Sequence, residues 1–174
     1  MPLKKRPDGK FDTLNTKEEC LKAKDGLYEI KNQNKTLCSD FSKEKDFVHF
    51  VTSNVFSFVR LLFNDEVISF ETEYNLDKQY KLHPRGRRID LFIVGRKKKY
   101  VIEAKNPKFG TESRAAIGQI LDYGRELNDK NIELVIITTH FDINTAKTIK
   151  YYNLPIRYVY LSKKFFVEYL RSEE

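Results

Sequence analysis

The sequence predicts an α/β domain in which a mixed central sheet is flanked by helices. Two adjacent strand-like segments, 88–94 and 100–105, are joined by a short polar turn. A near-continuous apolar run at 132–139 is typical of a central strand that is buried on both faces. Helical periodicity separates the later strands, and such helical crossovers make neighbouring strands parallel. The predicted order is αβββαβαβ, followed by a further C-terminal helix.

The first core helix is predicted at 42–63, with Ser42 as its N-cap. Glu44, in the first turn, lies on the same face as the apolar residues of this helix. The preceding residues, 1–41, are rich in lysine and only weakly periodic, so we expect a basic accessory segment before a core domain at 42–174. The apolar residues of the helix recur at spacings of three and four: Phe47, Val51, Val55, Phe58 and Leu62.

The next strand is predicted at 67–75, where apolar and polar residues alternate as in a half-buried strand. Its predicted buried side carries Ile68, Phe70 and Tyr74. Periodicity, caps and breakers predict the later elements. They are a helix at 111–127, a helix at 144–152, a strand at 156–161 and a helix at 162–170.

The turn between 88–94 and 100–105 sets the pairing of these two strands. A loop of four residues pairs Val94 with Lys99 and therefore Asp90 with Glu103. Directly opposite residues share a sheet face, so two carboxylates meet there. Lys105 points the same way, because side chains alternate along a strand. A loop of five residues would shift the pairing by one and place Asp90 on the other face, unless a bulge corrected it.

Opposed carboxylates destabilise a sheet, and a hard divalent cation would offset their repulsion. Mg²⁺ takes oxygen ligands and usually only one or two carboxylates, so the predicted ligands are Asp90, Glu103 and the backbone carbonyl of Ala104, with Mn²⁺ as a substitute ion. Lys105 beside this metal suits phosphodiester hydrolysis, because it can position water and offset developing charge. The alternative is an ordinary surface cluster in which Glu103 pairs with Lys105. Asp90 would then pair with Arg88.

The helix predicted at 111–127 adds Gln119 and Tyr123, which share a face. The order of these residues resembles the PD-(D/E)XK nuclease superfamily, in the branch where an E-x-K strand precedes a Q-x-x-x-Y helix. The matching residues are Asp90, then Glu103-Ala104-Lys105, then Gln119-Ile120-Leu121-Asp122-Tyr123. The match departs from the family pattern at Ile89, because the proline that can precede the Asp, and that is often missing in the family, is absent here.

This resemblance implies a restriction-endonuclease-like core and a Mg²⁺-dependent DNA endonuclease. It assigns Asp90 and Glu103 to the metal, Lys105 to catalysis, and Gln119 and Tyr123 to auxiliary roles at the catalytic site.

Similar enzymes often place a further active-site Glu on the first helix, which makes Glu44 a catalytic candidate. Its alternative role is to interact with the helix dipole. Glu73, in the strand 67–75, is the rival for this extra acid, and its alternative role is that of a solvent-facing strand residue.

Composition favours a polyanionic partner: 32 Lys and Arg against 25 Asp and Glu give a net charge of +7. The basic loop 81–88 leads into the Asp90 strand, so we expect Arg85, Arg87 and Arg88 to contact DNA phosphates. No apolar run is long enough for a membrane span. We therefore expect a cytoplasmic protein of one domain, and a homodimer is compatible with it.

Two alternatives to an enzyme remain open. One is a catalytically inactive nucleic-acid-binding module with the same fold, and the other is an interaction protein with surface ion pairs. The complete set of Asp90, Glu103 and Lys105 favours the enzyme, since degenerate copies tend to lose one of the three.

Overall fold

The computed structural model describes residues 41–77, 87–106, 112–140, 142–161 and 163–173. Its elements are, in chain order, α2 (Glu44–Ser53), α3 (Val55–Phe63), β1 (Val67–Asn75), β2 (Arg88–Gly95), β3 (Lys99–Lys105), α4 (Glu112–Leu127), β4 (Ile132–Thr138), α5 (Ile143–Tyr151), β5 (Ile156–Tyr160) and α6 (Lys163–Glu173).

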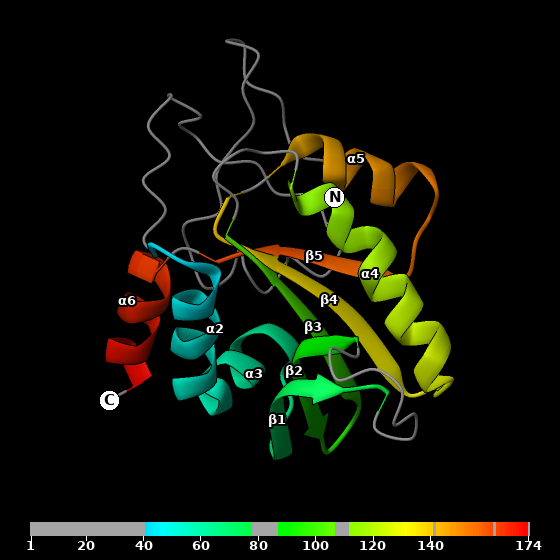
Figure 1. The fold of residues 1–174 in the computed structure, drawn as a ribbon. Coiled ribbons are helices and arrows are strands. Elements are labelled where there is room, and N and C mark those ends of the chain that lie inside the picture. The colour runs from blue at the N-terminus through cyan, green and yellow to red at the C-terminus, as the bar shows by residue number, and fades with distance from the viewer. Residues whose placement is uncertain (1–40, 78–86, 107–111, 141, 162, 174) are drawn as a thin grey trace, which may run out of the picture.

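The architecture is α/β, with a five-stranded sheet in the order β1-β2-β3-β4-β5 between two layers of helices. β1, β2 and β3 are antiparallel neighbours, whereas β3, β4 and β5 run parallel. Helices α4 and α5 make the two crossovers that parallel neighbours need. Figure 1 shows these two helices on one face of the sheet and α2, α3 and α6 on the other. The predicted α/β class and mixed sheet are confirmed.

Each sheet face has its own hydrophobic core. One core joins the α2, α3 and α6 layer to Leu91, Ile93, Ile102 and other strand residues. The second joins α4 and α5 to Val101, Ile136 and further strand residues. The central strands are therefore covered on both sides. No helix in the described ranges is both long enough and apolar enough to cross a membrane.

The predicted single helix at 42–63 is in fact two helices, which meet at Asn54. The backbone of Asn54 leaves the helical region (φ −123°, ψ 27°), and its side-chain amide donates to the carbonyl of Phe50 at 2.9 Å. The apolar spacing continues across the break because both helices pack on the same core. The N-cap is Lys43 rather than Ser42, whose hydroxyl donates to the carboxylate of Asp46 at 2.9 Å.

The bounds predicted for β1 are correct, but its half-buried character is not. Ile68 is 65% exposed and Phe70 is 41% exposed. Within the described part of the chain β1 is an edge strand with one neighbour, and of its three residues predicted to be buried only Tyr74 packs against a core.

Candidate metal and catalytic site

The β2–β3 turn has the predicted length, and Val94 pairs with Lys99. The amide of Gly95 donates to the carbonyl of Lys98 at 2.8 Å, which closes the turn. Asp65, which precedes β1, accepts hydrogen bonds from the amides of Lys97 and Lys98 at 3.1 and 3.3 Å. A Cβ atom at Gly95 would collide with the carboxylate of Asp65, so the turn needs glycine at that position.

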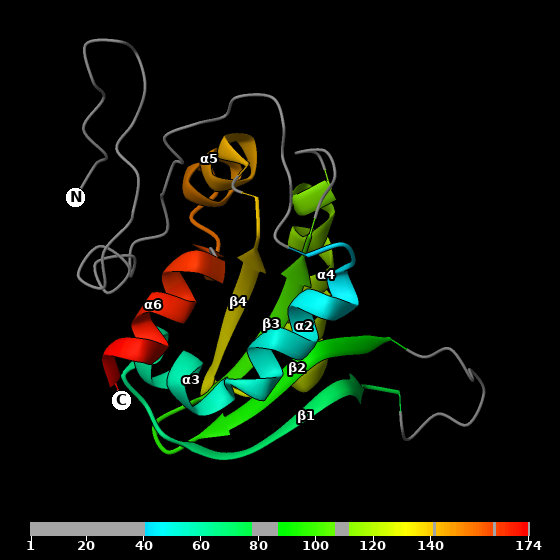
Figure 2. The ribbon, with the colours of Figure 1, turned by 90° about the vertical axis from the view of Figure 1, so that its left-hand side faces the viewer.

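The pairing of β2 with β3 extends from this turn to Leu91 opposite Ile102. Beyond that pair the two strands separate, and Figure 2 shows β1 and β2 running away from β3. Asp90 faces the gap, and its Oδ2 accepts a hydrogen bond from the amide of Ala104 at 2.8 Å. The N–H and C=O of one strand residue point to the same side, so the Ala104 carbonyl faces the same gap.

Asp90 also lies at the point where the inward-facing side chains of β2 switch from one face of the sheet to the other. Leu91 belongs to the core under α2 and α3, but Ile89 belongs to the core under α4 and α5. Across the ladder, Tyr74 pairs with Ile89 and packs against the same core. Glu73, which precedes Tyr74 on β1, has a φ of 50°, which is unusual for a residue with a side chain. The irregularity in both strands falls at the level of Asp90.

Glu103 and Lys105 lie beside Asp90, on β3. Glu103 is only 2% exposed, and its Oε1 lies 2.7 Å from the Nζ of Lys105. Its Oε2 is buried and has no hydrogen-bond partner among the described residues. A buried carboxylate oxygen without a partner is costly, so this atom marks a place where a cation would fit.

The charges at the site are shifted from their ordinary behaviour. Burial raises the pKa of Glu103 to about 7, and the nearby Asp90 adds to the increase. Burial also raises the pKa of Asp90, although the hydrogen bond from Ala104 opposes this. Burial alone would lower the pKa of Lys105, but Glu103 raises it above its ordinary value. Lys105 is therefore a cation at neutral pH, beside two acids whose ionised forms are disfavoured by burial.

The two candidates for the extra acid lie on different elements and contact different cations. Glu44, at the start of α2, places its Oε1 3.8 Å from the Nζ of Lys105. Glu73, on β1, is exposed and places its Oε2 3.0 Å from the Nη1 of Arg88. Both carboxylates raise the pKa of Asp90, so both lie within electrostatic range of it. The fold brings Glu44 to the lysine and leaves Glu73 paired with an arginine.

The two residues expected on α4 differ in burial. Tyr123 is buried, and its hydroxyl donates to the backbone carbonyl of Arg88 at 2.9 Å. Burial raises the pKa of Tyr123 to about 12, and Glu103 and Asp90 contribute to the increase, so the phenol is a donor at neutral pH. Gln119, one turn earlier, is exposed, so the pair spans the edge of the apolar stripe.

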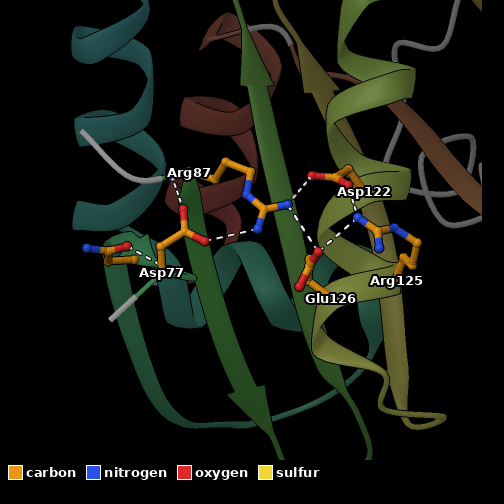
Figure 3. Close-up of polar contacts among 6 residues, drawn as sticks. Asp77, Arg87, Asp122, Arg125 and Glu126 are labelled. Carbon is orange, nitrogen blue, oxygen red and sulfur yellow. Dashed lines mark hydrogen bonds and ion pairs between the residues drawn. The ribbon is translucent and has the colours of Figure 1, made fainter. Parts of the chain in front are cut away.

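The three arginines expected to contact phosphates lie in different surroundings. Arg85 is outside the described residues. Arg88 is exposed and pairs with Glu73. Arg87 is held in a cluster of ion pairs, shown in Figure 3. The acids of this cluster were not predicted from the sequence, and they are Asp77, Asp122 and Glu126.

The donor set suits a hard cation. Within the described ranges, no group of three or more His, Cys, Asp or Glu side chains could hold a metal ion. A metal would therefore rest on Asp90, Glu103 and the Ala104 carbonyl, a set of the size that Mg²⁺ takes when water completes its coordination. The unpartnered Oε2 of Glu103 supports this fit.

Comparison of the chain with protein-family models, with curated proteins and with solved structures gives no match. What the site can do follows from its own geometry. The buried Glu103, the half-buried Asp90, the carbonyl of Ala104 and the charged Lys105 lie together where β2 and β3 separate.

Proposed function

We propose that this chain is a Mg²⁺-dependent DNA endonuclease with a restriction-endonuclease-like core. The observation that carries the proposal is the buried Oε2 of Glu103, which lacks a partner among the described residues in a site shared with Asp90 and Lys105. The position of the site supports it too. The ladder ends at Leu91, and the resulting gap leaves backbone and side-chain oxygens facing one space.

Hydrolysis of a phosphodiester forms a bond between a water oxygen and phosphorus and breaks one P–O ester bond. Asp90, Glu103 and the Ala104 carbonyl would hold the metal. When bound, Mg²⁺ would polarise the phosphoryl oxygen and lower the pKa of a coordinated water. Lys105, kept protonated by Glu103, can donate to the attacking water and offset the negative charge that develops on the phosphate oxygens.

The remaining residues place these groups. Tyr123 holds the backbone at Arg88, two residues before Asp90. Glu44 approaches Lys105 from the α2 layer, so its carboxylate can orient the ammonium or accept a proton from water. DNA is the proposed polyanion, in keeping with the net charge of +7.

A simple surface cluster of ion pairs fits the geometry less well. Surface pairs form between exposed side chains and contribute little to stability. Here Glu103 is 2% exposed, and only one of its two oxygens meets Lys105. An inactive DNA-binding module would not need that unpartnered oxygen either.

The test is cleavage of a panel of DNA forms: single strands, duplexes, flaps and four-way junctions. Each form is incubated with Mg²⁺, with Mn²⁺ and with EDTA. Cleavage of at least one form with metal and of none with EDTA is the expected result. Metal-dependent binding without any cleavage would favour the inactive module, and neither binding nor cleavage would favour the interaction protein.

A further inference from the structure

Arg87 immediately precedes β2, three residues before Asp90. Its guanidinium meets three carboxylates (Figure 3), with Nη2 2.9 Å from Asp77 and Nη1 2.6 Å from Asp122 and 3.3 Å from Glu126. Its backbone amide also donates to Asp77 at 2.7 Å. Asp77 follows β1, and the other two acids lie on α4. One residue therefore ties the start of β2 both to the end of β1 and to α4.

The start of β2 pairs with β1 on one side, where Tyr74 lies opposite Ile89 and Asn75 opposite Arg88, but it lacks a strand partner on the other side. The hydrogen-bonded ladder with β3 ends at Leu91, so β3 does not hold the backbone that precedes Asp90. Two neighbouring residues on α4 supply contacts in its place. Asp122 binds the side chain of Arg87, and Tyr123 donates to the carbonyl of Arg88. α4 therefore holds, together with β1, the residues just before Asp90.

The charges around Arg87 are those of a structural ion pair. Arg125 binds the same α4 acids, Asp122 at 2.6 Å and Glu126 at 2.8 Å. With Asp77, the cluster holds three carboxylates and two guanidinium groups. Hydrogen bonds to Asp77 and Asp122 raise the pKa of Arg87 above its ordinary value. A phosphate approaching Arg87 would have to compete with three carboxylates.

We propose that Arg87 is a positioning residue for the metal site rather than a phosphate contact. It fixes the start of β2 against Asp77, Asp122 and Glu126, and so keeps the carboxylate of Asp90 against the amide of Ala104. The structural part of this assignment stands without any activity, whereas its effect on cleavage rests on the nuclease function proposed above. It also replaces the expectation, based on sequence alone, that Arg87 contacts DNA.

The first test uses neither metal nor DNA. The amide of Ala104 donates to Asp90 at 2.8 Å, a contact that should slow its hydrogen exchange, so the exchange rate will report the position of that carboxylate. Arg87→Gln should accelerate exchange at Ala104 about tenfold, a local opening that leaves the global stability unchanged. The amide of Ile102, in the same strand, serves as the internal reference.

Matched variants separate this role from a loss of folding. Arg87→Lys keeps one ion pair but cannot make the forked contact, so exchange at Ala104 should rise less. Arg88→Gln removes the neighbouring guanidinium, which pairs with the exposed Glu73, and should leave that amide unchanged. If Arg87→Gln does not fold, the double variant Asp122→Asn, Glu126→Gln removes the α4 side of the cluster and should give the same local acceleration.

The second test measures metal. Arg87→Gln should raise the Mn²⁺ concentration needed for half-maximal binding or cleavage by about tenfold, the size of effect seen for residues that orient metal ligands. The dependence of DNA affinity on salt should not change. Unaltered exchange at Ala104 in the folded variants, or a reduced salt slope with a normal metal requirement, would overturn the assignment. If the wild-type protein cleaves no DNA, the proposed function fails, and exchange and Mn²⁺ calorimetry still decide the role of Arg87.

Discussion

The carboxylate of Asp90 accepts a hydrogen bond from the backbone amide of Ala104 at 2.8 Å, across the gap where β2 and β3 separate. A side chain thus supplies the acceptor that a neighbouring strand would otherwise provide. Because Ala104 lies between Glu103 and Lys105, this one contact sets the distance between the acid on β2 and both charged groups on β3.

Asp90→Ala and Glu103→Ala should each abolish DNA cleavage, because each removes one of the two carboxylates that would hold the metal. Circular dichroism should show a retained fold. In wild-type protein Mn²⁺ should raise the melting temperature by mass action, and in both variants this increase should disappear. Wild-type cleavage by either variant would contradict the assignment.

Lys105→Ala should lower the single-turnover cleavage rate about 100-fold or more, because the ammonium acts on charge that develops in the transition state. DNA affinity, measured by filter binding in Ca²⁺, should change little. The opposite pattern, weaker binding at an unchanged rate, would make Lys105 a phosphate anchor.

Glu44→Gln should lower the cleavage rate more than Glu73→Gln. The carboxylate of Glu44 lies 3.8 Å from the Nζ of Lys105, whereas Glu73 is exposed and pairs with Arg88. Rates are compared at saturating Mg²⁺, and the two isosteric changes serve as controls for each other. A metal-soaked crystal with Glu73 on the ion and Glu44 in solvent would reverse the order, and the roles of Asp90 and Glu103 would be unaffected.

DNA affinity should fall steeply with salt, because cations that neutralise phosphates release counterions. Arg88→Ala should reduce the salt slope by about one, the contribution of a single phosphate contact. Arg96→Ala, at the opposite end of β2, removes an exposed arginine that pairs with Glu66 and is the matched control. An equal loss of slope in both variants would indicate non-specific charge instead of a defined DNA-binding face.

Asp65→Asn should lower the free energy of unfolding at pH 7 by about 1–3 kcal/mol, since a buried, hydrogen-bonded carboxylate is lost. Burial would raise the pKa of Asp65, but hydrogen bonds from Tyr100 and three backbone amides hold it below its ordinary value. Because its pKa is lower in the folded than in the unfolded protein, Asp65 stabilises the fold at pH values above its unfolded pKa of about 3.9. This stabilisation is lost as the pH falls below that value.

The difference between wild type and Asp65→Asn should therefore narrow in urea unfolding experiments below about pH 4. Tyr100→Phe, which removes one donor at 2.8 Å and leaves the carboxylate in place, should have a smaller effect. A difference that is constant with pH would show that the charge of Asp65 is not what stabilises the fold.

The pairing of Val94 with Lys99 could be predicted because the length of a hairpin turn fixes the sum of paired positions. The exposure of β1 could not be predicted. Alternation of apolar and polar residues indicates a strand, but it does not show whether anything packs on the apolar side. The break at Asn54 could not be predicted either. The apolar residues of α2 and α3 keep the same helical spacing across it, because both helices pack on one core.

The acids around Arg87 were beyond prediction for a different reason. They are separated from it by 10, 35 and 39 residues, and nothing in the local sequence of Asp77, Asp122 or Glu126 marks them as its partners. The neighbours of Arg87 in the chain are basic, and that pattern favours a phosphate contact. The fold surrounds it instead with residues from two other elements.

The two ends of β2 should therefore differ in how they accept changes in chain length. The turn at Gly95 lies roughly 16 Å along the strand from Asp90, and its length sets the register of the ladder that ends at Leu91, next to this acid. One residue added there would turn every side chain of β2 to the opposite face. Residues added between Asp77 and Arg87 leave that register unchanged, because these two close the other end directly. The protein should therefore tolerate insertions between Asp77 and Arg87 better than insertions at the Gly95 turn.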